Sequence, residues 1–151
     1  MSLKCILQPN SASCMPTALA SVMNVAVEDI FDYLGHDGTE IIWPELPKPY
    51  CYRSFHIQEM CAYALMGNYA ITTFTPMIGI APRRSCEPHV VVCPHYADYT
   101  TYYQSVLTGT SAQGNPHAVA WDGKQMMDPS VGEFITPDFD ITHTHVVIKI
   151  K

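Results

Sequence analysis

The chain has 151 residues and a formal net charge of −6; 48% of its residues are hydrophobic and 15% are charged. This length and composition predict a single globular domain, residues 1–151, with a hydrophobic core of its own. The acidic balance argues against binding to nucleic acid or to a membrane surface, because either partner normally requires a basic face.

The N-terminal segment, MSLKCILQPNS, contains an apolar run that is too short for a signal peptide. No stretch approaches the roughly 18 apolar residues that a membrane-spanning helix needs. We therefore expect a cytoplasmic protein. In that compartment the six cysteines should be reduced, and those other than Cys14 should be buried and inert.

A polar loop leads into a helix across residues 8–23, QPNSASCMPTALASVM. We expect Ser13 to be the N-cap and Cys14 the first helical residue, because Pro16 is tolerated only in a first turn and apolar residues then recur at helical spacing. A thiol at this position meets unpaired backbone N–H groups and the positive end of the helix dipole. Both favour the thiolate, which is the form that acts as a nucleophile or metal ligand.

Two further amphipathic helices are predicted, over residues 27–35 and 56–66, and each is closed by a glycine. The segment between them carries prolines at positions 44, 47 and 49, which remove backbone donors and favour irregular structure. We expect a surface loop that covers the core. A segment lying over a cleft is the alternative.

Beyond these helices the pattern becomes extended. We expect strands over Tyr69–Thr75, His89–Cys93 and His145–Ile150, with a loop over Gly109–Pro116. The tyrosine-rich stretch Tyr96–Tyr103 is typical of a half-buried surface, and a substrate groove is the alternative.

The spacing Cys86-x2-His89-x3-Cys93-x-His95 contains residue types that bind zinc. If His89 and Cys93 lie at the two ends of a strand, however, their Cα atoms are roughly 13 Å apart. A single tetrahedral ion does not easily bridge that distance. The sequence therefore predicts no metal site and no cofactor.

The clearest hairpin signal is His117–Trp121 and Lys124–Asp128, separated by Asp122-Gly123. A two-residue turn pairs Trp121 with Lys124 and, at the far end, His117 with Asp128. Opposed residues share a face, with Cβ atoms about 5 Å apart. The turn thus predicts an imidazole within reach of a carboxylate.

A nucleophilic cysteine needs a histidine to accept its proton and an acceptor that orients that histidine. His117 and Asp128 fit these roles, and Gln8, six residues before Cys14, could donate a hydrogen bond to a developing oxyanion. Structural roles are also open to them: a cross-strand ion pair for His117 and Asp128, and a loop-capping side chain for Gln8. His143 and His145 are rival bases in principle, but no carboxylate is predicted opposite either of them.

These motifs, QPNSASC, HAVAWDG and MDPS, resemble those of papain-like cysteine peptidases, and most closely the C39-like group. The resemblance implies an α+β fold in which an N-terminal cysteine helix packs on an antiparallel sheet. It also implies Cys14 as nucleophile, His117 as base and then acid, Asp128 as orienting residue and Gln8 as oxyanion donor. Met15 and Pro16 follow the cysteine, where the family usually has glycine.

The expected function is therefore a cysteine hydrolase that cleaves a peptide, isopeptide or related amide bond in a protein or peptide substrate through a thioester. Because one scaffold serves several reactions, acyl transfer and deamidation stay open. A second hypothesis is a non-catalytic binding or inhibitory module, such as a phage or bacterial effector, that retains the scaffold.

Overall fold

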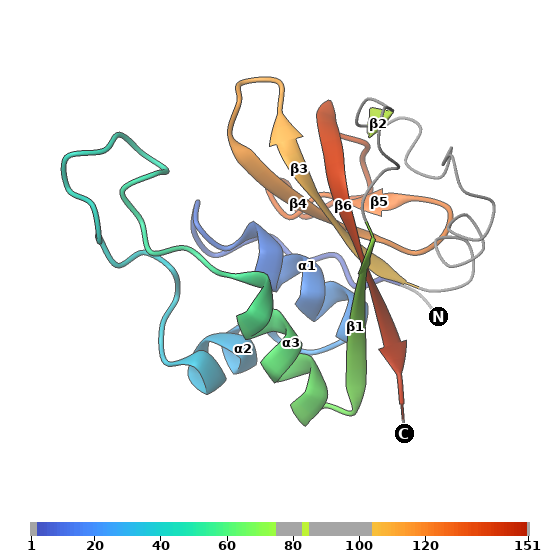
Figure 1. Cartoon of the computed structure of the whole chain (residues 1–151). Helices are drawn as coiled ribbons and strands as arrows, with labels where there is room; N and C mark the ends of the chain where they lie inside the picture. Colours follow the sequence, from blue (N-terminus) through green and yellow to red (C-terminus); the bar gives the residue numbers. More distant parts are fainter. Residues whose placement is uncertain (1–2, 75–82, 85–103, 151) are drawn as a thin grey trace.

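The computed structural model describes residues 3–74, 83–84 and 104–150 (Figure 1). The helices come first in the chain: α1 (Cys14–Met23), α2 (Val27–Leu34) and α3 (Ile57–Met66). The strands follow: β1 (Tyr69–Phe74), β2 (Arg83–Arg84), β3 (Ser105–Ser111), β4 (Pro116–Trp121), β5 (Met126–Met127) and β6 (Phe139–Lys149). The predicted α+β class is confirmed.

The helix ends lie close to the positions that the sequence predicts. Ser13 is the N-cap of α1, and α2 ends at Gly35, whose φ of 80° is left-handed and suits glycine. At the start of α3 the Glu59 carboxylate accepts a hydrogen bond from the His56 N–H at 2.8 Å, as part of a capping box.

Within the described ranges no single helix is long and apolar enough to cross a membrane. Helices α1 and α2 reach that length and composition only when they are taken together, and they are bent at 118° to each other.

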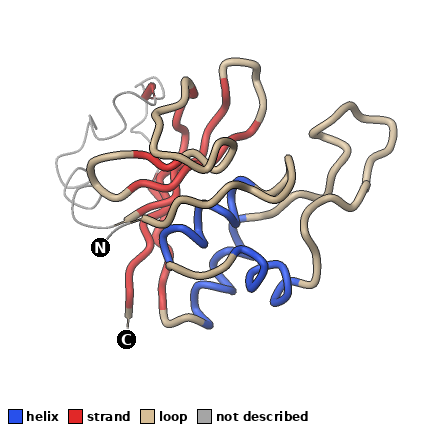
Figure 2. Tube along the Cα trace, turned by 180° about the vertical axis from the view of Figure 1, so that it is seen from behind, coloured by secondary structure: helices blue, strands red, loops and turns tan. Residues whose placement is uncertain are grey.

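The sheet is antiparallel, with strand order β1-β6-β3-β4-β5, and β2 pairs with β6. Helix α1 packs against β4 and β3, and α3 packs against β1. The three helices lie together on one side of the sheet (Figures 1 and 2). A cysteine helix packed on an antiparallel sheet, as expected, is therefore present.

Side chains on the two faces of the sheet enter two separate clusters. Val106 packs with the helices, whereas the next residue, Leu107, packs on the other side, because successive strand residues point to opposite faces. The helix side includes Ala18, Leu19, Ile30, Met60, Ala118 and Ala120. The other side consists of Leu107, Val119, Trp121, Met126, Phe139 and Ile141.

The predicted hairpin register is wrong by two residues. Trp121 pairs with Met126 rather than Lys124, and Ala120 pairs with Met127. Asp122 explains the longer turn, because its Oδ1 accepts hydrogen bonds from the N–H groups of Lys124 and Gln125, both at 2.8 Å. The connection is therefore a four-residue loop. A shift of two residues leaves every side chain on its predicted face.

Two extended segments also differ from the sequence prediction. The expected loop over Gly109–Pro116 is partly strand, since β3 continues to Ser111 and pairs with β4 and β6. Hydrogen bonds to two neighbours stabilise this stretch despite its glycine and polar residues. The final strand is longer than expected and starts at Phe139.

Three predicted features lie outside the described residues: the strand His89–Cys93, the tyrosine-rich stretch Tyr96–Tyr103 and the Cys86–His95 spacing. Strand β1 agrees with the prediction from Tyr69 as far as Phe74.

Gly109 is a point at which the sheet tolerates no side chain. It pairs with His117 on β4, and the register with β6 shifts between Thr108 and Gly109. A Cβ at Gly109 would overlap the backbone carbonyl of Asp140 on β6. We expect Gly109→Ala to lower the free energy of unfolding by about 2–3 kcal/mol in urea denaturation, because backbone must move.

Gly67→Ala is the matched control for this prediction. Its new methyl group would meet mainly the flexible end of Met23, and the backbone φ there is −88°. We expect a change below about 1 kcal/mol. Equal losses in the two variants would contradict the proposed crowding at Gly109.

Candidate active site

The loop before Cys14 is held by side-chain hydrogen bonds. Asn10 accepts one from the Ala12 N–H at 2.8 Å and donates one to the Asp37 carbonyl at 3.1 Å. The Ser13 hydroxyl donates to the Asn10 carbonyl at 3.0 Å and forms no capping bond to the helix. The loop therefore fixes Cys14 at the start of α1. The Ser13 side chain does not cap the first N–H groups of the helix, and these groups have no partner within the helix.

The predicted contact between His117 and Asp128 is present. His117 Nε2 lies 3.1 Å from Asp128 Oδ1, and the two side chains are 15% and 4% exposed. In the observed register the two residues are diagonal neighbours on one face rather than directly opposed. The His117 ring also meets the buried Phe139 ring edge-on, with centroids 5.4 Å apart, so it is held on two sides.

The carboxylate of Asp128 is fixed by the turn that follows it. Its Oδ1 accepts hydrogen bonds from the N–H of Ser130 at 3.0 Å and from the Ser130 hydroxyl at 2.8 Å. The Asp128 carbonyl accepts a further bond from the Gly132 N–H at 2.8 Å. This local network leaves the carboxylate one orientation, toward His117.

The side chains of Cys14 and Asp128 both act on the protonation of His117. Burial acts to lower the pKa of His117, but hydrogen bonds with Asp128 and with the Cys14 side chain, together with the negative charges of both, raise it from 6.5 to about 9. Burial acts to raise the pKa of Asp128, but hydrogen bonds from His117 and Ser130 hold it below 3.8. The imidazole is thus stabilised as a cation between two acidic partners.

Gln8 is tied to the same region through its backbone. Its N–H donates to the Pro129 carbonyl at 2.8 Å, which joins the loop before Cys14 to the residue after Asp128. Its side-chain Oε1 is buried without a hydrogen-bond partner in the part of the chain that the structure describes. Unsatisfied buried polar atoms are uncommon and call for a functional explanation.

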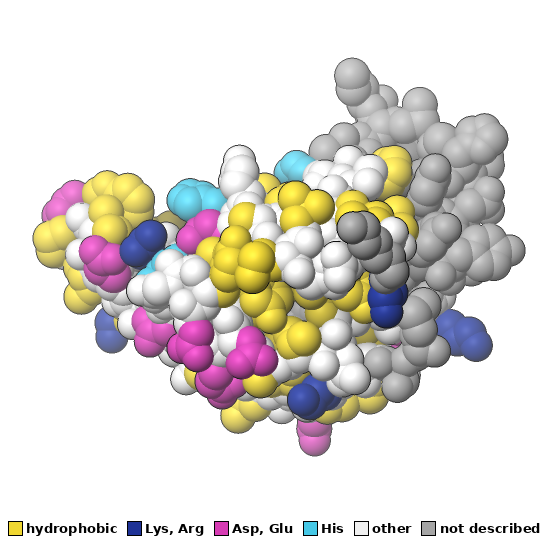
Figure 3. Space-filling view, turned by 90° about the horizontal axis from the view of Figure 1, so that it is seen from below, with side chains coloured by type: hydrophobic (Ala, Val, Ile, Leu, Met, Phe, Trp, Pro, Cys, Tyr) yellow, Lys and Arg dark blue, Asp and Glu magenta, His cyan; other side chains and the backbone are white. Residues whose placement is uncertain are grey.

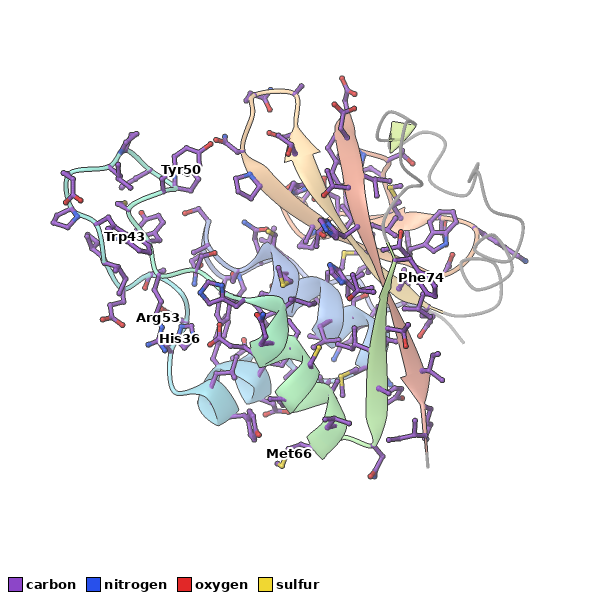
Figure 4. The ribbon with its side chains drawn as sticks, in the orientation of Figure 1. His36, Trp43, Tyr50, Arg53, Met66 and Phe74 are labelled. Carbon is purple, nitrogen blue, oxygen red and sulfur yellow. The ribbon has the colours of Figure 1, made fainter. Side chains whose placement is uncertain are left out.

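Cys14, which is half-buried, lines a pocket of about 570 Å³. Residues 39–54, which we call the strap, supply much of the opposite wall, including Trp43, Tyr50 and Arg53 (Figure 4). Asn115 and Pro116, directly before His117, also line it. We call this space the strap pocket. The segment with prolines at positions 44, 47 and 49 therefore lies over a cleft, which is the second of the two interpretations that its sequence allows.

The rival histidines lie in other surroundings. His145 is buried, and its two ring nitrogens lie 2.8 Å from the Thr73 hydroxyl and 3.0 Å from the Thr108 hydroxyl. Burial, with a smaller effect from the charge of His143, lowers the pKa of His145 to about 4. His143 is exposed and bonds to the Thr142 hydroxyl. Neither histidine has a carboxylate hydrogen-bond partner among the described residues.

The remaining candidates for site chemistry are the other cysteines and metal ligands. Cys5, Cys14, Cys51 and Cys61 are free thiols. Cys51 is buried as expected, but the expectation is wrong for Cys5, which is exposed, and for Cys61, which is only half-buried. Within residues 3–74, 83–84 and 104–150, no three His, Cys, Asp or Glu side chains gather as a metal-binding group. The structure brings together Cys14 and His117, which the sequence predicts as nucleophile and base, whereas the sequence does not identify the strap residues Trp43 and Tyr50 as site residues.

In comparisons with known proteins, no protein family model matches the chain, and a search of curated proteins finds no match.

The ion pair between His117 and Asp128 predicts a pH-dependent stability. Because the pKa of folded His117 is raised from 6.5 to about 9, the pair's contribution is full below pH 6.5, while Asp128 is charged, and is lost as the pH rises through about 9. We expect Asp128→Asn to cost about 1–2 kcal/mol at about pH 6, because it replaces a charged acceptor with a neutral one. Urea denaturation at about pH 6 and about pH 10 measures this difference, which should shrink at the higher pH.

Asp32→Asn, on the exposed part of α2, is the control. Its effect should be small and the same at both pH values. A cost of Asp128→Asn that does not change with pH would contradict the ion pair.

Proposed function

We propose that this protein is a papain-like cysteine hydrolase that cleaves an amide bond of a peptide or protein through a thioester on Cys14. One observation carries the proposal. The His117 ring is hydrogen-bonded to Asp128, and the Cys14 side chain also acts on it strongly enough to raise the pKa of the imidazole. A cysteine at a helix start, a histidine and an orienting carboxylate are the parts that nucleophilic catalysis requires.

The first step moves one proton. Because Nε2 of His117 is engaged by Asp128, Nδ1 is the ring nitrogen left to take the proton of the Cys14 thiol, and the raised pKa of His117 holds the proton there before the substrate binds. The resulting thiolate attacks the carbonyl carbon of the substrate, and the carbonyl π electrons move to the oxygen. The positive end of α1 and the imidazolium both favour the thiolate.

The later steps return that proton and add water. The backbone N–H of Cys14 and the side-chain amide of Gln8 stabilise the oxyanion. When the C–N bond breaks, His117 donates its proton to the departing amine, and a thioester remains. His117 then takes a proton from water, and the hydroxide attacks the thioester carbon. The C–S bond breaks, the product acid leaves and loses its proton to solvent, and the Cys14 thiolate and His117 imidazolium are restored.

The papain-like assignment is supported by architecture and chain order. A cysteine helix near the N-terminus packs against the antiparallel strand that carries the histidine as its second residue, and the aspartate follows the next strand. Gln8 precedes the cysteine and is joined by its backbone to the residue after the aspartate. These features match what the sequence resemblance implies.

The activated pair predicts selective alkylation of Cys14. At about pH 6.5, iodoacetamide should label Cys14 at least about tenfold faster than Cys5, an exposed free thiol in the same molecule. His117→Ala should remove this advantage, because no imidazolium is left to stabilise the thiolate. Peptide mass spectrometry measures both rates in a single sample.

His143→Ala is the matched control, since it removes an exposed histidine that has no carboxylate hydrogen-bond partner among the described residues. Labelling of Cys14 should be unchanged in this variant. Slow labelling of wild-type Cys14 that is indifferent to His117 would contradict the hydrolase and favour a binding module on the same scaffold.

A further inference from the structure

The surface is open on both sides of the nucleophile. Cys14 lines the strap pocket, and the next residue, Met15, lines a second cleft of about 560 Å³ between α3 and the strands. His56 lines both spaces. Thr108 and His143 form part of the second cleft, on the sheet side. A substrate carbonyl at Cys14 therefore has room for further residues in two directions.

The strap that forms the first pocket is a built structure rather than a loose loop. Backbone hydrogen bonds of 2.7–2.9 Å join its two arms, from Ile42 to Cys51 and from Arg53 to Glu40, and a third joins Ser54 to Gly38, the residue directly before the strap. At its outer end the Tyr50 hydroxyl donates to the Gly114 carbonyl at 3.0 Å (Figure 4). This bond connects the strap to the β3–β4 loop, and both segments line the pocket.

The strap also presents apolar and aromatic side chains to solvent. Trp43 and Tyr50, both in the pocket lining, are 47% and 46% exposed. Ile41, Ile42 and Leu46 are exposed on the same strap. Viewed from below, hydrophobic side chains gather on this projecting part of the molecule (Figure 3). Apolar side chains concentrated beside a reactive group mark a recognition surface.

The chemistry of the pocket lining favours one kind of occupant. Trp43, Tyr50 and Tyr52 bring three aromatic rings into it, and its lining among the described residues contains no aspartate or glutamate. Aromatic walls gain most from contact with a large apolar or aromatic side chain. The lining also contains the polar side chains of Lys48, Arg53, His56 and Asn115. Of these, Lys48 and Asn115 can donate hydrogen bonds to the backbone carbonyls of an extended chain.

We propose that the substrate is an extended polypeptide cut at an interior bond, with a large apolar or aromatic side chain of that polypeptide held in the strap pocket. The proposal rests on the proposed hydrolase function. The second cleft receives the chain on the other side of the cut bond. Trp43 is then a specificity-determining residue, and it takes no part in the proton transfers.

The test uses a tryptic digest of a cell lysate as a mixture of peptides. The digest is incubated with the full-length protein, and new peptide ends are identified by mass spectrometry, with Cys14→Ala as the background. Wild type should cut at interior bonds, with large apolar or aromatic residues enriched at one fixed position relative to the cut. Trp43→Ala should lower the rate at those preferred sites by about tenfold or more.

Two variants separate recognition from folding. Trp43→Phe keeps a ring and should retain the preference. Leu65→Ala removes an exposed apolar side chain from α3, outside the lining of both clefts, and it should cut like wild type. A preference that is unchanged in Trp43→Ala overturns the inference.

Alkylation of Cys14, measured on the same samples, separates the two proposals. Rapid alkylation together with cuts only at peptide ends, or with no cuts, overturns the interior-cleavage inference and leaves the hydrolase proposal standing. Slow alkylation of Cys14 without any cuts overturns both.

Discussion

The hydrogen bond between His117 and Asp128 is the constraint on which the site depends. It fixes one ring nitrogen of His117, so that the other is left for Cys14, and it supplies the charge that keeps the imidazole protonated. The bond requires β4 and β5 to lie side by side and the turn at Ser130 to hold the carboxylate. The pairing of β4 with β5 thus positions the Asp128 carboxylate that raises the pKa of His117.

Helix α1 connects this pair to the rest of the molecule. The helix is largely buried and packs on β4, so the position of Cys14 relative to His117 is set by core packing rather than by a loop alone. Gly109 allows β3 to pass close to β6 while it pairs with His117. In our proposal the strap adds recognition on the outer side of Cys14, where a change of sequence has little effect on the packing of the core.

Local sequence patterns predicted much of this arrangement. The start of α1 at Cys14 follows from proline and apolar spacing, which act within one turn. The sequence predicts the contact between His117 and Asp128 correctly although it predicts too short a hairpin turn. A shift of two residues in the register leaves each side chain on the same face of the sheet. The path of the strap and the length of β3 depend on bonds to distant residues, such as that from Tyr50 to Gly114, and no local pattern encodes them.

The central claim is that Cys14 and Asp128 together hold His117 as a cation, and the titration of the His117 ring by NMR tests it most directly. The account predicts a midpoint near pH 9 in the wild-type protein. It also predicts that Cys14→Ser and Asp128→Asn each move the midpoint down toward 6.5, the ordinary value for histidine. A wild-type midpoint near 6.5 that neither substitution moves would contradict the account.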